Sequence, residues 1–159
     1  MIETTFIKTP LGIASISGDE NGITKISITE DTEKVPSKEI PEILKEAVIQ
    51  LQDYFKGDRS TFSIKMNPSG TDFQKKVWHE LSKIPFGKTV SYLDIAKQLG
   101  DPKCIRAAAS ANGKNPLWVV VPCHRVIGSD GSLTGYAGGL WRKKWLLAHE
   151  NPVKQQSLF

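Results

Sequence analysis

A change of pattern at Asn67-Pro68-Ser69-Gly70 constrains the fold more than any other feature of the sequence. Before it, β-rich runs and one amphipathic pattern predominate, whereas after it the signals of short, capped helices follow one another closely. Proline and glycine this close together are typical of a linker. We therefore predict a domain at residues 1–70, a second at 71–150 and a tail at 151–159.

The first domain is predicted to be a small antiparallel sheet with one helix. Two β-rich runs, 11–17 and 23–28, flank a turn sequence at 19–22 that ends in Asn-Gly, which is typical of a hairpin. A third strand is expected at 4–8. Apolar residues then recur at three- and four-residue intervals over 40–55, which predicts an amphipathic helix closed by a glycine.

The second domain is predicted to be mainly helical, so that the whole chain belongs to the α+β class. Thr71-Asp72-Phe73-Gln74 has the pattern of a capping box, and Ser91 precedes a short helix expected at 92–99. Asp101-Pro102 then predicts the start of a helix at 103–111. The helices at 92–99 and 103–111, joined by a tight turn with a glycine, fit a helix-turn-helix. The helix at 103–111 fits an alanine-rich core helix equally well. A final helix is expected at 140–150.

Cys123 and His124 follow an apolar run at 117–121, which predicts a short buried strand ended by Pro122. A cysteine becomes a nucleophile when a base or a positive charge favours its thiolate. Adjacent side chains of a strand point in opposite directions, so Cys123 and His124 can pair only if the chain turns there. His149-Glu150, at the end of the last helix, could orient the imidazole. A cysteine that serves only packing is the open alternative.

Composition limits the metal sites, the cellular location and the partners that are expected for this chain. The two cysteines form no C-x-x-C pair and the three histidines are scattered, so no metal site is expected. Cys104 is interpreted as a packing residue. No apolar run has the length of a signal segment or a membrane span, which predicts a cytoplasmic protein with reduced thiols and no membrane contact. A formal net charge of +4 permits a polyanionic partner without requiring one.

Six segments of the second half resemble the O6-alkylguanine-DNA alkyltransferases, also called methylated-DNA–protein-cysteine methyltransferases. In the order of that family they are Ile84-Pro85-Phe86-Gly87-Lys88-Thr89-Val90-Ser91-Tyr92, Arg106-Ala107, Asn115-Pro116, Pro122-Cys123-His124-Arg125-Val126-Ile127, Gly135-Tyr136-Ala137-Gly138-Gly139 and Trp145-Leu146-Leu147-Ala148-His149-Glu150. The resemblance covers about half of the chain. The first domain is similar in style only, to a ribonuclease-H-like domain of the family; residues 1–70 contain no Cys or His, so the zinc site of some relatives is not expected.

The resemblance implies DNA repair by direct, single-turnover alkyl transfer. Cys123 would attack the alkyl carbon on O6 of a guanine that has been flipped out of double-stranded DNA. His124 would take the thiol proton through a water molecule, and Glu150 would orient that imidazole. Tyr92 would hydrogen-bond the flipped base and help to protonate the leaving guanine. Asn115 would hold the turn between the recognition helix and the active site. No cofactor is implied.

The resemblance also implies how DNA is bound, by a protein expected to act as a monomer. The helix at 103–111 would lie in the minor groove, and Arg106 would enter the base stack. The other implied DNA- or substrate-binding residues are Ala107, Tyr92, Val126, Ser129, Tyr136 and Ala137. Where the family commonly has Val-Gly in this helix, the chain has Ala108-Ala109, which leaves its DNA affinity open. The range of alkyl groups and activity on O4-alkylthymine are also open.

Two other functions are weighed against this one. An alkyltransferase-like damage-binding protein flips the base without transfer, but such proteins lack the acceptor cysteine. A Cys-His hydrolase of unrelated fold would turn over repeatedly and need no DNA. The tail Gln155-Gln156-Ser157-Leu158-Phe159 resembles the Gln-x-x-Leu-Phe peptides that dock on the bacterial sliding clamp, which predicts a contact through Gln155, Leu158 and Phe159. Packing of the tail against its own domain is the alternative.

Overall fold

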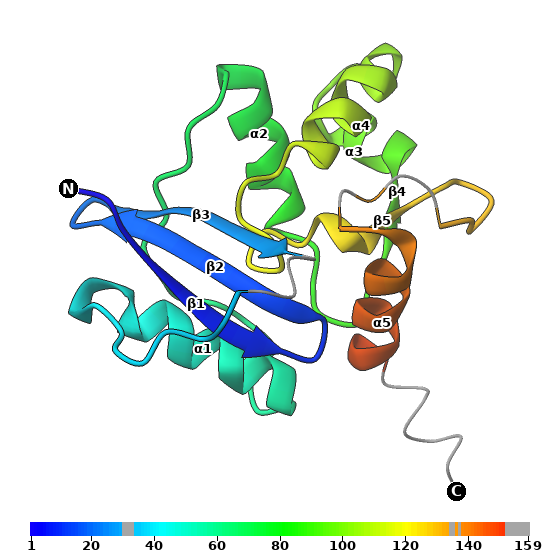
Figure 1. The fold of residues 1–159 in the computed structure, drawn as a ribbon. Coiled ribbons are helices and arrows are strands. Elements are labelled where there is room, and N and C mark those ends of the chain that lie inside the picture. The colour runs from blue at the N-terminus through cyan, green and yellow to red at the C-terminus, as the bar shows by residue number, and fades with distance from the viewer. Residues whose placement is uncertain (30–33, 134–135, 137, 152–159) are drawn as a thin grey trace, which may run out of the picture. The chain divides into compact units, whose positions relative to one another are not determined.

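The structure, a computed structural model, describes residues 1–29, 34–133, 136 and 138–151 (Figure 1). The chain divides into two compact units. Unit 1 comprises Met1–Ser69 and Pro116–Val120, and unit 2 comprises Gly70–Asn115 and Val121–Phe159. The predicted domain bounds stay a prediction, since Pro116–Val120 groups with the first part of the chain.

Unit 1 contains the predicted antiparallel sheet, with strands in the order β1 (Glu3–Thr9), β2 (Gly12–Asp19) and β3 (Gly22–Thr29). Alternate side chains, among them Ala14 and Ile16, are buried, as expected for a sheet with one covered face. The β2–β3 turn requires Gly22, because its φ is +130° and a Cβ there would lie 3.0 Å from the carbonyl oxygen of Lys65.

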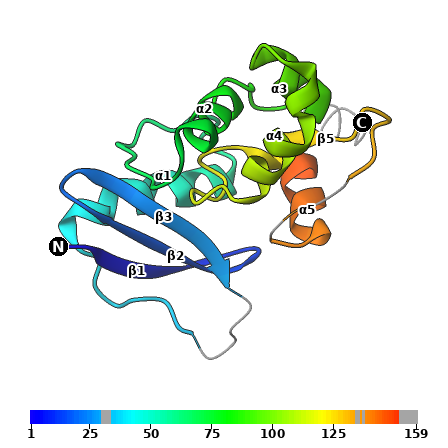
Figure 2. The same ribbon diagram turned by 90° about the horizontal axis from the view of Figure 1, so that it is seen from above.

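A helical segment of unit 1 contacts this sheet (Figure 2). It starts as the short 3₁₀ helix η1 (Glu42–Leu44) and continues as α1 (Lys45–Lys56). The face of α1 that carries Ala47, Val48, Leu51 and Tyr54 is buried, which confirms the amphipathic pattern. The helix ends at Gly57, whose φ of +87° gives the left-handed cap that glycine adopts without strain.

The predicted strand at 117–121 is wrong, although its burial was predicted correctly. Ile26 N–H donates to Pro116 O (2.8 Å) and Trp118 N–H donates to Ile26 O (3.1 Å), which pairs only the start of the segment with β3. Val119 then takes a left-handed φ of +69°, and the chain turns. A continuous apolar run indicates burial but does not distinguish a strand from a buried turn.

Unit 2 consists mainly of short helices, in agreement with the sequence. In chain order its elements are α2 (Asp72–Leu81), β4 (Val90–Ser91), α3 (Tyr92–Gln98), η2 (Pro102–Cys104), α4 (Ile105–Gly113), η3 (Cys123–Arg125), β5 (Val126–Ile127) and α5 (Leu140–Glu150). Capping boxes at Thr71 and Ser91 start α2 and α3, and Asp101 caps η2 through Lys103 N–H. Val77 and Leu81 of α2 are buried, whereas Phe73 in its first turn is 36% exposed.

One face of α4 packs in the core, as the interpretation of an alanine-rich core helix predicts, while the helix-turn-helix interpretation stays a prediction. Ala108 and Ala111 are buried, and α4 contacts α2 and α3. Trp78 Nε1–H donates to Ala111 O over 2.9 Å, which fixes α4 against α2. Arg106 and Ala107 are exposed on the other side. Among the described residues, no helix is both long and apolar enough to cross a membrane.

Candidate functional site

The turn that the sequence requires at Cys123 is present as η3, a single turn of 3₁₀ helix. Cys123 N–H donates to Val121 O (2.8 Å) and Arg125 N–H donates to Pro122 O (3.0 Å). This turn places Cys123, His124 and Arg125 in the interior, at 7%, 0% and 6% exposure. The next residues form β5, which pairs in parallel with β4, so that Val126 lies opposite Val90 and Ile127 opposite Ser91.

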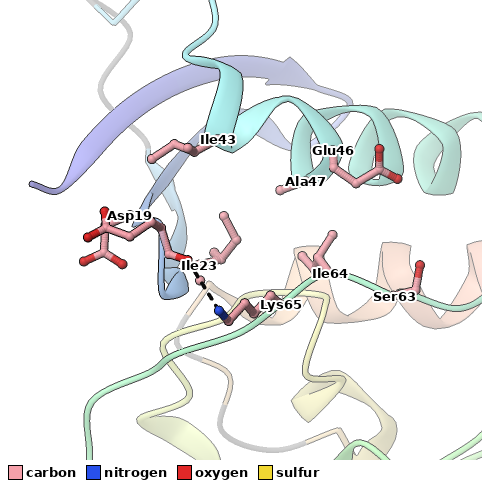
Figure 3. Close-up of a pocket in the computed structure, with 10 residues that line it drawn as sticks. Asp19, Ile23, Ile43, Glu46, Ala47, Ser63, Ile64 and Lys65 are labelled. Carbon is pink, nitrogen blue, oxygen red and sulfur yellow. Dashed lines mark hydrogen bonds between the residues drawn. The ribbon is translucent and has the colours of Figure 1, made fainter.

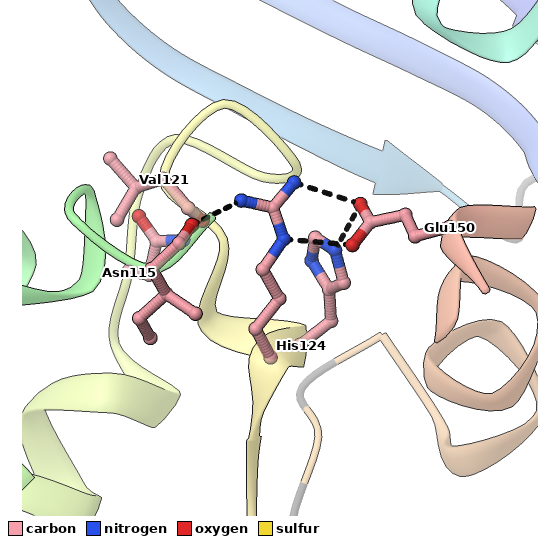
Figure 4. Close-up of polar contacts among 6 residues, drawn as sticks. Asn115, Val121, His124 and Glu150 are labelled. Atoms are coloured by element: carbon pink, nitrogen blue, oxygen red, sulfur yellow. Dashed lines mark hydrogen bonds and ion pairs between the residues drawn. The ribbon is translucent and has the colours of Figure 1, made fainter. Parts of the chain in front are cut away.

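His124 and Arg125 both bind the carboxylate of Glu150, at the end of α5 (Figure 4). The distance from His124 Nε2 to Glu150 Oε2 is 2.8 Å. Arg125 donates from Nε to Oε1 (2.7 Å) and from Nη2 to Oε2 (3.0 Å), and its Nη1 donates to Ile84 O (2.6 Å). Glu150 is 2% exposed, which excludes a solvated acid at a helix end.

This contact decides the charge states of the pair. Burial alone would raise the pKa of Glu150, but hydrogen bonds from His124 and Arg125 lower it to about 2. Burial lowers the pKa of His124 below its usual value, against the opposing effect of Glu150. At neutral pH the carboxylate is therefore charged and the imidazole neutral. With Nε2–H assigned as donor to Glu150, Nδ1 is left as an acceptor. It is buried and has no hydrogen-bond partner among the described residues.

Asn115 links the end of α4 to the segment that carries Cys123. Asn115 and Val121 lie side by side in Figure 4, and Asn115 Nδ2–H donates to Val121 O over 2.7 Å. The same carbonyl accepts from Cys123 N–H. Burial raises the pKa of Cys123, and the side chain of Asn115 opposes that rise by favouring the thiolate. Asn115 therefore couples the position of α4 to the position of the thiol.

Lys143 was missed by the sequence reasoning. It is fully buried on α5, and its Nζ lies 5.8 Å from the centroid of the Tyr92 ring. Burial raises the pKa of Cys123, while Asn115, the charge of Lys143 and the side chain of Tyr136 act in the opposite direction. Lys143 shares one helix face with Leu146 and Glu150, and this spacing becomes a signal only once that face is known to be buried.

The remaining predicted residues lie apart from this cluster or cannot be placed. Arg106 and Ala107 are exposed on α4, and Ser129 is exposed in the turn after β5. Val126 is buried, directly after η3. Ala137, Gln155, Leu158 and Phe159 lie outside the described residues.

Two further features bear on alternative sites. Within the described ranges, no three His, Cys, Asp or Glu side chains gather to hold a metal ion. Unit 1 has a hollow of about 280 Å³ (Figure 3). Ile23 and Ile64 are among its apolar lining, Asp19 and Glu46 supply acids, and Lys65 Nζ donates to Glu20 O over 3.4 Å. None of the predicted catalytic residues belongs to it.

Comparison with known proteins identifies relatives of both halves. Residues 72–152 match the family model of the 6-O-methylguanine DNA methyltransferase DNA binding domain, and residues 2–68 match that of the ribonuclease-like domain. A methylated-DNA–protein-cysteine methyltransferase of Mycolicibacterium paratuberculosis is 43% identical, over 99% of this chain and 98% of its own. One of Methanosarcina acetivorans is also 43% identical, over 90% and 94%.

Solved structures agree with these matches. The crystal structure of Mycobacterium tuberculosis OGT in complex with DNA superposes with a TM-score of 0.82 at 39% identity, covering 97% of this chain and 98% of that one. At 39% identity, the similarity supports common family membership as well as a common fold. It extends over both units of the chain.

Proposed function

The chain belongs to the 6-O-methylguanine DNA methyltransferase family, and on that premise we propose that Cys123 is the residue that accepts the alkyl group. The protein repairs DNA as a methylated-DNA–protein-cysteine methyltransferase, by direct transfer of the alkyl group to a cysteine of its own. One observation carries the choice of Cys123: its thiol shares a single turn with His124, which is bonded to Glu150 at 2.8 Å.

The reaction balances without a cofactor. The thiol of Cys123 passes its proton to Nδ1 of His124 through a water molecule, and the thiolate attacks the alkyl carbon of O6-alkylguanine. The S–C bond forms as the C–O6 bond breaks, and the guanine that leaves takes up a proton. The products are S-alkylcysteine and unmodified guanine, so each molecule acts once.

The buried charges keep His124 able to accept a proton. Glu150 holds His124 in the tautomer whose Nδ1 accepts, and Arg125 fixes Glu150 through two hydrogen bonds. A thiol in the interior resists ionisation, because burial raises the pKa of Cys123. Proton transfer to His124 and the nearby charge of Lys143 both offset that resistance.

The groups around the thiol bind the flipped base. Tyr92, at the start of α3, donates to the base and helps to protonate it as it leaves. The backbone carbonyls of Cys123 and Val126 accept from its exocyclic amine. The backbone N–H of Ala137 meets O6, and Tyr136 closes the pocket. The ring of Tyr92 lies beside Lys143, whose own position near Cys123 supports this arrangement.

DNA is the partner of the protein. We place α4 in the minor groove, with Arg106 inserted in the base stack, Ala107 close to the groove floor and Ser129 at a phosphate. Flipping a base costs a few kcal/mol, which an inserted side chain helps to offset. The degenerate minor groove suits a repair protein that has to act in any sequence. The exposed position of Arg106 and Ala107 supports this placement.

Two proposals concern the setting of the reaction. A cytoplasmic location suits a mechanism that requires a reduced thiol.

A clamp contact through Gln155, Leu158 and Phe159 is a separate proposal. Deleting residues 155–159 is expected to abolish binding to the sliding clamp, and binding that survives the deletion would refute the contact.

The central test is the mass of the protein after one reaction. Incubated with duplex DNA that bears one O6-methylguanine, the protein is expected to gain a single methyl group on the peptide that contains Cys123, with stoichiometric loss of the lesion. Cys123→Ser should gain none. The matched control Cys104→Ser should be methylated like the unaltered chain, since Cys104 lies in η2. Methylation at Cys104, or tight lesion binding with no transfer, would overturn the proposal.

A further inference from the structure

The exposed face of α4 continues beyond Arg106 to a second cation, Lys114. Arg106, Ala107 and Ser110 of α4 are exposed, whereas Ala108, Ala111 and Asn112 are buried. Lys103 of the preceding η2 and Lys114 directly after α4 are exposed as well. Arg106, Ser110 and Lys114 are spaced by four residues and so form one row along the helix. The segment 103–114 contains three cations and no acid.

From this row we infer that Lys114 is a second anchor for the DNA backbone, which binds a phosphate at the far end of α4. The inference rests on the proposed function, in which α4 faces DNA. Neither Arg106 nor Lys114 forms an ion pair within the described part of the chain, so both charges face solvent. The Ser110 hydroxyl between them is a further donor suited to a phosphate oxygen.

A cation at this end of the helix favours DNA binding for an electrostatic reason. The last carbonyl groups of a helix carry partial negative charge, which repels a polyanion laid along the helix. Lys114 follows the last residue of α4 directly, and its own N–H donates to Ala111 O. Its ammonium group therefore offsets the repulsion at the place where it is strongest.

Lys114 is also held in a fixed relation to the thiol. The next residue, Asn115, donates to Val121 O, which accepts from Cys123 N–H as well. Arg106 and Lys114 lie eight residues apart, or about 12 Å along a helix. Since a base pair rises about 3.4 Å, Lys114 would reach a phosphate some three to four base pairs from the step that Arg106 enters.

The salt dependence of DNA binding tests this inference. Dissociation constants for a lesion-free duplex are measured by fluorescence anisotropy between about 50 and 200 mM KCl. One lost phosphate contact reduces the slope of log affinity against log salt by about 0.9. Over this range, Lys114→Gln should therefore lose roughly threefold less affinity than the unaltered chain. Lys114→Arg, which keeps the charge, should restore the slope.

A matched control separates a contact from a general effect of charge. Lys25→Gln removes one exposed lysine from β3 in unit 1 and should leave the slope unchanged. An unchanged slope in Lys114→Gln, or an equal reduction in Lys25→Gln, would overturn the inference. Methyl transfer to Cys123 is recorded in parallel. If transfer occurs and the slope stays the same, only the anchor fails; if the unaltered chain neither binds duplex nor accepts a methyl, the proposed function fails.

Discussion

Unit 2 carries its charges in two different settings. Around Cys123, the side chains of Arg125, Lys143 and Glu150 are buried at 6%, 0% and 2% exposure. On α4, Arg106 and Lys114 are open to solvent. Buried charges have to be paired, because water no longer solvates them, whereas exposed charges remain available to a partner. Under the proposed function, the first set acts on the thiol and the second set binds DNA.

The largest expected effect on stability follows from removing one of the buried charged side chains, Arg125. Arg125→Met leaves the Glu150 carboxylate without its two guanidinium hydrogen bonds, and such a loss costs about 3–5 kcal/mol of unfolding free energy. The control is Lys83→Met, which removes an exposed ion pair with Glu80 and should cost no more than about 1 kcal/mol. Urea unfolding of both variants measures the difference. Equal costs would show that burial does not set the value of these pairs.

Acid should weaken the same cluster, by up to a few kcal/mol. The pKa of Glu150 is lowered to about 2 from an ordinary 4.5, so its contribution is complete above 4.5 and is lost as the pH falls towards 2. The pKa of His124 is lowered as well, so the neutral folded form also loses stability below about 6.5. Unfolding free energies from pH 7 to pH 2 measure this decline.

Glu150→Gln identifies the source of the acid sensitivity. This variant removes the carboxylate that titrates, so the part of the decline between pH 4.5 and pH 2 should become flatter, on a lower overall stability. A curve that keeps its full steepness in this range would assign the acid sensitivity to other carboxylates.

Lys143 should affect reactivity more than folding. Its charge lowers the pKa of Cys123, so Lys143→Met should move the pH profile of thiol alkylation by iodoacetamide to higher pH. Each unit of pKa reduces the thiolate fraction at neutral pH about tenfold. Lys144→Met, a change of the exposed neighbour on α5, should leave the profile in place. Equal profiles for the unaltered chain and Lys143→Met would show that this lysine serves packing alone.

The two settings also differ in how far the sequence predicts them. Helix starts were predictable because Thr71, Ser91 and Asp101 act on backbone groups at most three residues away. The exposed face of α4 follows from helical spacing alone. The buried set requires a contact between His124 and Glu150, which are 26 residues apart. Glu150 was predicted to orient the imidazole, first as a candidate beside His149 and then through the resemblance, whereas the roles of Arg125 and Lys143 were not predicted.

Two features escaped prediction for physical reasons. Val119 adopts a left-handed backbone, which a β-branched residue avoids unless the surrounding structure imposes it, so no local propensity indicates it. Lysine is rarely buried, and the sequence of α5 gave Lys143 no apolar character that would place it inside. Its position on one face with Leu146 and Glu150 becomes informative only once that face is known to be the buried one.

The smallest effect on folding is expected for Arg106→Ala. This variant separates the exposed charges from the buried charges most clearly. An exposed side chain on a helix contributes little to stability, so the unfolding free energy should change by no more than about 0.5 kcal/mol. Methyl transfer at limiting DNA should nevertheless slow markedly, because under the proposed insertion of Arg106 no other side chain fills the gap left by the flipped base. Urea unfolding and single-turnover transfer measure the two effects. A clear loss of stability, or transfer at the unaltered rate, would mean that Arg106 belongs to the structural charges rather than to those that hold DNA.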